Sequence, residues 1–259
     1  MLRNSSSKHP HASGHPLRRK ILLVAALPLW VLISFLAVQL LVAALAAALN
    51  AVGVPLSTIN QAVFNASAGA IVYTLTILVV IGVPWLVKRR ATSREELGLS
   101  RLPTWLDILI TPVGFVFYLL LSGSLLFVAQ QLLTFIDFDQ AQDVGFDQLT
   151  QQFEYLLAFF TLVVMAPIAE EILFRGYLLA KLRRHAATWV AVLVSSLLFG
   201  LVHFAWNVGI DTFALGIVLC LVTIWTKSLW PATLIHMLKN GIAFYFLFIN
   251  PTVLNTLGG

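Results

Sequence analysis

The chain has 259 residues, of which 59% are hydrophobic and only 10% are charged, and its mean hydropathy is +0.92. These values exclude a soluble globular domain and indicate a membrane protein that crosses the bilayer several times. The net charge of +5 does not indicate a nucleic-acid partner, because the basic residues stand in short clusters beside apolar segments.

Residues 1–20 are predicted to form a disordered cytoplasmic tail, because this segment is polar and rich in serine, proline and histidine. Its histidines, His9, His11 and His15, are expected to be solvated rather than to bind a metal. The apolar segment that follows is about twice as long as the apolar core of a secretory signal. It is therefore predicted to remain in the protein as the first membrane span.

Seven apolar segments follow the tail, and most of them reach the length of about 20 residues that is needed to cross a hydrocarbon core. They are residues 21–49, 66–87, 108–133, 153–180, 189–206, 212–226 and 229–249. The sequence therefore predicts an all-α, polytopic transmembrane helix bundle with about seven spans, within a range of six to eight. The sixth segment is short, and residues 207–211 are expected to join it to the fifth in a tight hairpin.

The distribution of basic residues predicts the orientation of the bundle. With seven crossings, fourteen of the sixteen Lys and Arg residues fall on one side of the membrane, which the positive-inside rule makes cytoplasmic. We therefore expect a multi-pass protein of the cell membrane with a cytoplasmic N-terminus. The other two basic residues, Arg175 and Lys239, are predicted to lie within the membrane, with Lys239 beside an interior acid or the interface.

Three ionisable residues lie close together in the fourth apolar segment: Glu170, Glu171 and Arg175. Charged groups in hydrocarbon are unfavourable by several kcal/mol unless they pair or meet water, so such a cluster indicates a functional site. Glu171 and Arg175 are four residues apart and share a helical face, which predicts an ion pair. Glu170 points about 100° away from that face, and we expect it to face another helix or a water-filled cavity.

Two later segments supply polar partners for this cluster. His203 follows Phe199 by four residues in one segment, and Asn240 follows His236 by four residues in the last one. Residues at this spacing share a helical face, so three helices offer a carboxylate, two imidazoles and an amide to a common interior site. A histidine within the membrane often serves only as an interhelical hydrogen-bond partner, but the combination is more specific than its members.

This set of groups is typical of peptide-bond hydrolysis. A glutamate beside a histidine can deprotonate a water, and an asparagine or histidine can donate to the oxyanion that forms at the carbonyl. Alternatively, Glu170, His203 and His236 can hold a divalent metal such as zinc, and the sequence is compatible with either arrangement. The usual zinc-protease motif H-E-x-x-H is absent from the sequence.

Two other functions use similar residues. An acid pair with an arginine is also found in ion-coupled transporters, although a permeation path needs polar groups along its length and the first three segments hold almost none. A noncatalytic membrane scaffold or immunity protein could keep the same fold. Hydrolysis of a peptide bond remains the leading interpretation because the polar groups are concentrated in the second half of the chain.

Three motifs carry a family resemblance: E-E-x-x-x-R at 170–175, F-x-x-x-H at 199–203 and H-x-x-x-N at 236–240. They resemble the motifs of the CAAX-processing and bacteriocin-processing (CPBP or Abi) intramembrane proteases, which include the type II CAAX prenyl endopeptidases. The resemblance covers residues 153 to about 248. It divides one integral membrane domain into N-terminal helices at 21–135 and a catalytic core at 153–249.

The resemblance implies a role for each motif residue. Glu170 is expected to act as the general base and His203 to assist it with the attacking water. His236 and Asn240 are expected to stabilise the oxyanion or to complete a metal site. The residues expected to support this arrangement are Glu171, Arg175 and Phe199.

The expected protein is an intramembrane endopeptidase whose partners are the lipid bilayer and a membrane-associated protein or peptide substrate. Its site is predicted to open toward the cytoplasmic side, because Glu170 lies about 15 Å from the basic end of its helix. The cofactor is either a divalent metal or none. The sequence carries no signal for a particular oligomeric state or substrate.

Overall fold

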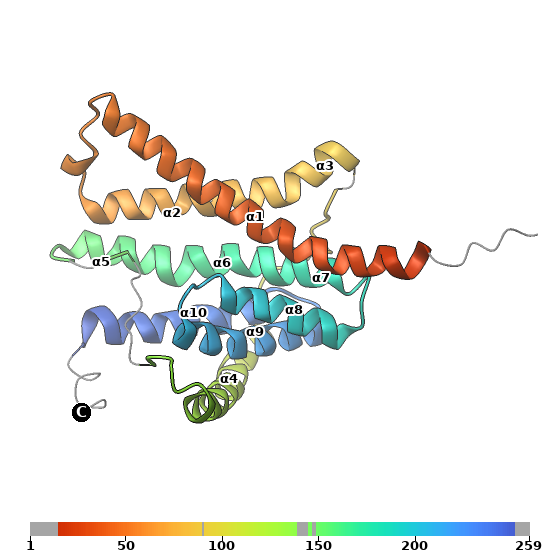
Figure 1. The fold of residues 1–259 in the computed structure, drawn as a ribbon. Coiled ribbons are helices and arrows are strands. Elements are labelled where there is room, and N and C mark those ends of the chain that lie inside the picture. The colour runs from red at the N-terminus through yellow and green to blue at the C-terminus, as the bar shows by residue number, and fades with distance from the viewer. Residues whose placement is uncertain (1–14, 90, 139–144, 147–148, 252–259) are drawn as a thin grey trace, which may run out of the picture.

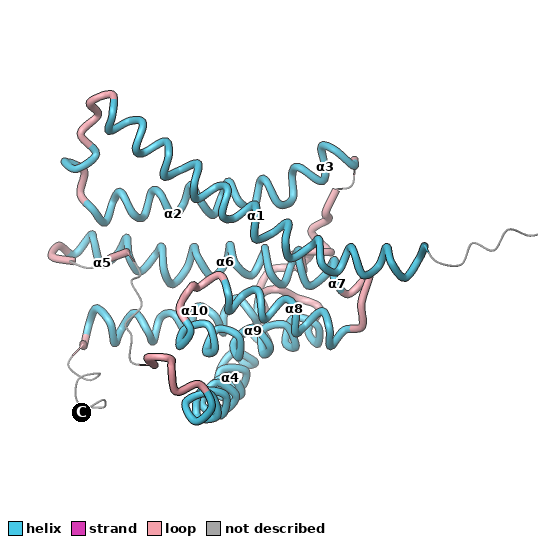
Figure 2. Tube along the Cα trace, in the orientation of Figure 1, coloured by secondary structure: helices cyan, strands magenta, loops and turns pink. Residues whose placement is uncertain are grey.

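The computed structural model describes residues 15–89, 91–138, 145–146 and 149–251, and within these residues it contains helices but no strand (Figures 1 and 2). The all-α prediction is therefore confirmed. Residues 1–14 of the predicted tail lie outside the described residues. The first helix begins at His15, within the segment that was predicted to be disordered.

The helices of the N-terminal half are α1 (His15–Ala51), η1 (Leu56–Thr58), α2 (Gln61–Ile77), η2 (Leu78–Gly82), α3 (Val83–Lys88) and α4 (Trp105–Leu132). Those that follow are α5 (Gln152–Phe159), η3 (Phe160–Met165), α6 (Ala166–Glu171), η4 (Ile172–Leu179), α7 (Ala180–Leu182), α8 (Thr188–Leu201), α9 (Trp206–Thr226), α10 (Trp230–Phe244) and η5 (Tyr245–Ile249). Here η1 is a 3₁₀ turn, whereas η2 to η5 are π-helical segments that continue the neighbouring α-helices.

Three layers of helices build the bundle (Figure 1). The middle layer is one long rod, formed by α5, η3, α6, η4 and α7. The α1 and α2–α3 helices cross each other on one side of this rod, and α8, α9, α10 and α4 lie on the other side. The central rod therefore has helices on both sides. Side chains of the rod can contact residues from either set of helices.

Within the described ranges, six helices are long and apolar enough to cross a membrane, and α8, with 14 residues, is a shorter apolar helix. The chain is therefore a multi-pass membrane protein, and the prediction of about seven spans is confirmed. Its orientation stays a prediction. The predicted boundary between the fifth and sixth spans is wrong, because residues 207–211 lie inside α9 and the turn falls at residues 202–205. The short helix is consequently the fifth rather than the sixth.

Small residues explain why the turn lies there. A Cβ on Gly200 would come within 2.6 Å of the Gly209 carbonyl oxygen, and one on Gly216 would come within 2.9 Å of the Ser196 Cβ. The backbones of α8 and α9 therefore approach closely, as is common where membrane helices pack through small residues. Phe204, with a φ of 53°, makes the left-handed step that reverses the chain between them.

The connector between α3 and α4, residues 89–104, binds the ends of two helices that carry motif residues. The backbone N–H of Leu229 donates to the Gly98 carbonyl at 3.0 Å, and the Trp230 indole donates to the Arg101 carbonyl at 2.7 Å. The Lys181 ammonium donates to the Glu96 carboxylate at 3.1 Å. Burial opposes the ionisation of Glu96, but this hydrogen bond, a second one from a backbone N–H and two nearby positive charges together outweigh it and lower the pKa of Glu96. The connector thus ties α7 to the start of α10.

Replacing Gly98 by alanine is expected to destabilise this contact. Gly98 has a φ of +71°, and a Cβ there would lie 2.9 Å from the Leu229 backbone nitrogen. Gly53 is a matched control, because its φ is +86° but nothing lies within 4 Å of its Cβ position. We expect Gly98→Ala to lower the free energy of unfolding by about 2 kcal/mol more than Gly53→Ala does. Thermal unfolding in detergent measures this difference. Equal losses of stability in the two variants would contradict the close approach of Gly98 to Leu229.

Candidate functional site

The central rod places the first motif between two π-helical segments. Glu170 and Glu171 end α6, which lies between η3 and η4, and Arg175 lies within η4. A π-helical segment widens the turn and shifts the side chains that follow it, and such segments are frequent at functional sites. The local backbone therefore already distinguishes this part of the rod from a regular membrane helix.

The predicted ion pair between Glu171 and Arg175 is confirmed. Arg175 Nη1 donates to Glu171 Oε1 at 2.8 Å, and neither side chain is exposed. The Arg175 guanidinium also lies over the Phe199 ring, 4.2 Å from its centroid. Phe199 in turn makes edge contacts with the His203 and His236 rings, at centroid distances of 5.3 and 5.6 Å. Phe199 therefore contacts both the arginine of the buried ion pair and the two histidines.

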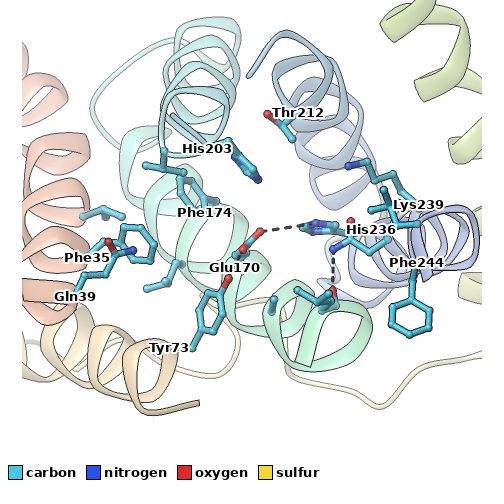
Figure 3. Close-up of a pocket in the computed structure, with 18 of the residues that line it drawn as sticks. Phe35, Gln39, Tyr73, Glu170, Phe174, His203, Thr212, His236, Lys239 and Phe244 are labelled. Carbon is cyan, nitrogen blue, oxygen red and sulfur yellow. Dashed lines mark hydrogen bonds and ion pairs between the residues drawn. The ribbon is translucent and has the colours of Figure 1, made fainter. Parts of the chain in front are cut away.

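Glu171 also determines the tautomer of His236. His236 Nδ1 lies 2.8 Å from Glu171 Oε1, the same oxygen that accepts from Arg175. Because an ionised carboxylate only accepts hydrogen bonds, we assign the proton to His236 Nδ1. The lone pair of Nε2 is then directed toward Glu170, whose Oε2 lies 3.8 Å away (Figure 3).

His203, just after the end of α8, is also held by a hydrogen bond at its Nδ1. Its Nδ1 lies 2.8 Å from the Phe199 carbonyl oxygen, which can only accept, so Nδ1 carries the proton. Its Nε2 is therefore free to accept a hydrogen bond from a group in the cavity. Figure 3 shows the His203 ring beside Glu170, on the opposite side of the cavity from Tyr73.

A cavity of about 480 Å³ brings the predicted catalytic residues together. They all line it: Glu170, His203, His236 and Asn240. Asn240 Nδ2 donates to the Leu162 carbonyl at 2.9 Å, which fixes the amide against η3. Much of the remaining wall is apolar, with Phe35 from α1 and Phe244 from α10 among its members (Figure 3). The cavity therefore combines a polar floor with walls suited to apolar groups.

Sequence reasoning missed one polar neighbour of Glu170. The Tyr73 hydroxyl, on α2, donates to Glu170 Oε1 at 2.7 Å. Tyr73 lies in an apolar segment without charged neighbours, and its place in the sequence gives no sign that its hydroxyl meets a residue 97 positions later. Only the packing of α2 against the rod reveals the contact.

Lys239 lies at the edge of the same cavity and pairs with an interior acid, as predicted. Its Nζ lies 3.5 Å from Asp211 Oδ2 on α9. Asp211 Oδ1 accepts hydrogen bonds from the Tyr118 hydroxyl at 2.7 Å and from the Ser122 hydroxyl at 2.5 Å. This network neutralises a lysine and an aspartate within the bundle and joins α4, α9 and α10.

The metal-binding alternative was tested against the positions of its three predicted ligands, Glu170, His203 and His236. Their donor atoms suit a divalent cation, and the hydrogen bonds at both Nδ1 atoms are typical of ligating histidines. Within the described part of the chain, however, no three His, Cys, Asp or Glu side chains are grouped closely enough to hold an ion. The described residues therefore do not form a metal site in this arrangement.

Comparisons with known proteins identify related sequences. Residues 152–242 match the family model described as type II CAAX prenyl endopeptidase Rce1-like. The chain is 34% identical over 101 residues to the membrane-embedded CAAX protease MroQ of Staphylococcus aureus, covering 37% of this chain but only 41% of that protein. It is 30% identical over 135 residues to the UPF0177 protein YxdF of Lactococcus lactis, covering 51% of this chain and 70% of that protein. No solved structure matches it.

Proposed function

The chain belongs to the Rce1-like CAAX protease family, and we propose that it is an intramembrane endopeptidase that hydrolyses a peptide bond in a membrane-associated protein or peptide. One observation carries this proposal: Glu170, a carboxylate in a membrane span, faces a cavity together with two histidines of assigned tautomer. The similarity to a membrane-embedded CAAX protease also supports a protease.

The proposed reaction begins with a water between Glu170 and the substrate carbonyl. Glu170 takes one proton from this water, and the water oxygen forms a bond with the carbonyl carbon, which gives a tetrahedral intermediate with a negative oxygen. The carbon–nitrogen bond then breaks, and the proton passes from Glu170 to the leaving amine. The products are a carboxylic acid and an amine, and the carboxylate of Glu170 is restored.

The other polar groups complete the proposed chemistry. His203 Nε2 accepts the second hydrogen of the water and orients its oxygen toward the carbonyl carbon. Asn240 has one amide hydrogen beyond the one that it donates to Leu162, and this hydrogen is available for the oxyanion. His236, whose Nδ1 is held by Glu171, keeps its Nε2 at the cavity beside Glu170.

The walls of the cavity indicate the class of substrate. Aromatic and aliphatic side chains from α1, η3 and α10–η5 line it, including Phe35, Leu162, Phe244 and Phe248. A peptide segment with apolar side chains beside the cleaved bond would bury them against these residues, at about 25 cal/mol for each Å² removed from water. The proposed substrate is therefore an extended, apolar segment that reaches the site from the membrane, and we propose that the site opens toward the cytoplasmic side.

A comparison of cleavage products tests the function. Purified protein in liposomes would be mixed with a library of membrane-associated peptides, and the products would be identified by mass spectrometry alongside those of Glu170→Gln. We expect a set of products with new termini that the variant does not form. Identical products from both proteins would contradict the proposal, and Glu170-dependent ion flux without any cleavage would favour a transporter instead.

A further inference from the structure

We propose that Tyr73 is a positioning residue that holds the Glu170 carboxylate in the orientation needed for water activation; this inference rests on the proposed function. The Tyr73 hydroxyl donates to Glu170 Oε1 at 2.7 Å, from a helix on the other side of the rod from His203 and His236 (Figures 1 and 3). The family model begins at residue 152, so Tyr73 lies outside the part of the chain that matches it.

The two oxygens of Glu170 have different surroundings. Oε1 accepts the hydroxyl proton of Tyr73, whereas Oε2 lies 3.8 Å from His236 Nε2. At 3.8 Å, His236 Nε2 is too far from this oxygen for a hydrogen bond. Among the described residues, the hydroxyl of Tyr73 is therefore the one side-chain donor in hydrogen-bond contact with this carboxylate. Without it, the Glu170 side chain could rotate in a cavity of about 480 Å³.

An anchored oxygen has a direct chemical use. When Tyr73 occupies Oε1, Oε2 is left to accept the proton of the attacking water, on the side of the carboxylate where the histidines lie (Figure 3). A catalytic group held in one geometry gains rate because less orientation has to be fixed at the moment of reaction. The hydroxyl itself does not touch the reacting atoms in this arrangement.

The helix that carries Tyr73 is held in register with the rod. The Asn60 amide, at the start of α2, donates to Glu154 Oε1 on α5 at 2.6 Å. Glu154 Oε2 accepts from the Thr150 and Gln151 backbone N–H groups at 2.6 and 2.9 Å. These bonds lock the start of α2 to the start of the rod. These contacts lie more than two helical turns before Tyr73 along α2. They help to hold its hydroxyl opposite Glu170.

The test is a kinetic comparison of Tyr73→Phe with the unchanged protein on a peptide that it cleaves. Phenylalanine keeps the ring and removes only the hydroxyl. We expect kcat to fall about tenfold, which is what the loss of one hydrogen bond to a charged group produces. We expect KM and the melting temperature to stay unchanged. Tyr155→Phe is the control, because the Tyr155 hydroxyl donates to the Leu149 carbonyl at 3.0 Å, and neither residue lines the cavity.

The outcomes separate this inference from the proposed function. A kcat for Tyr73→Phe equal to that of the unchanged protein, with Glu170→Gln inactive, would overturn the positioning role and leave the protease intact. If both Tyr73→Phe and Tyr155→Phe lowered kcat in proportion to a fall in the melting temperature, Tyr73 would have a structural role. That result would also overturn the positioning role. Full activity of Glu170→Gln would instead contradict the proposed function, and the inference would fall with it.

Discussion

Glu170→Gln is expected to lower kcat for peptide cleavage by about 10³-fold, the contribution that a positioned general base makes to a proton transfer. Glutamine has nearly the same size and can still accept the hydrogen bond from Tyr73, but its amide does not take a proton from water. The protein should therefore fold and bind substrate as before. Initial rates over a range of peptide concentrations separate the loss of kcat from any change in KM.

Glu95→Gln is the matched control for this substitution. Glu95 lies exposed in the connector and does not line the cavity, so the same chemical change there should leave kcat unaltered. If Glu170→Gln kept more than a tenth of the activity while Glu95→Gln was normal, Glu170 would not be the general base. The two His residues would then have to supply the proton acceptor.

Arg175→Met is expected to produce the largest loss of stability, about 3–5 kcal/mol, because it leaves Glu171 as a buried charge without its arginine partner. Both side chains are fully inaccessible in the structure, and the bond between them is 2.8 Å long. Methionine fills a similar volume but carries no charge. Thermal unfolding in detergent, or the yield of folded protein, measures the effect.

Two further variants show whether the cause is the unpaired charge. Arg183→Met removes an exposed arginine two turns along the same rod and should change the melting temperature little. Adding Glu171→Gln to Arg175→Met removes the carboxylate that has lost its arginine and should restore part of the lost stability. If the double variant were no more stable than Arg175→Met alone, the loss would come from packing against Phe199 instead.

The residues that the sequence could predict are those whose partners lie on the same helix or whose type is rare in hydrocarbon. The Glu171–Arg175 pair follows from a spacing of four residues. Glu170, His203 and His236 stand out because polar groups are unfavourable in apolar segments, and the structure places all three at one cavity. Their catalytic roles stay predictions until activity is measured.

Other features depend on contacts between helices, which no local pattern encodes. Residues 207–211 read as a break because they include an asparagine, a glycine and an aspartate. In the structure Gly209 serves the contact with α8, and Asp211 binds Tyr118 and Lys239, so these residues continue a helix. The predicted N-terminal helices at residues 21–135 also contribute to the site in the predicted core at 153–249, because Tyr73 donates to Glu170.

Hydrolysis consumes one water molecule for each bond that is cut, and the shortness of α8 bears on where that water comes from. With 14 residues, α8 is about 21 Å long, whereas the hydrocarbon core is about 30 Å thick. If Thr188 lies at one interface, the turn at residues 202–205 ends about 9 Å short of the other. Backbone groups at that depth need hydrogen-bond partners. The turn meets this need where it lines the cavity with Val202 and His203, and water that enters the cavity beside the turn has a short route to Glu170.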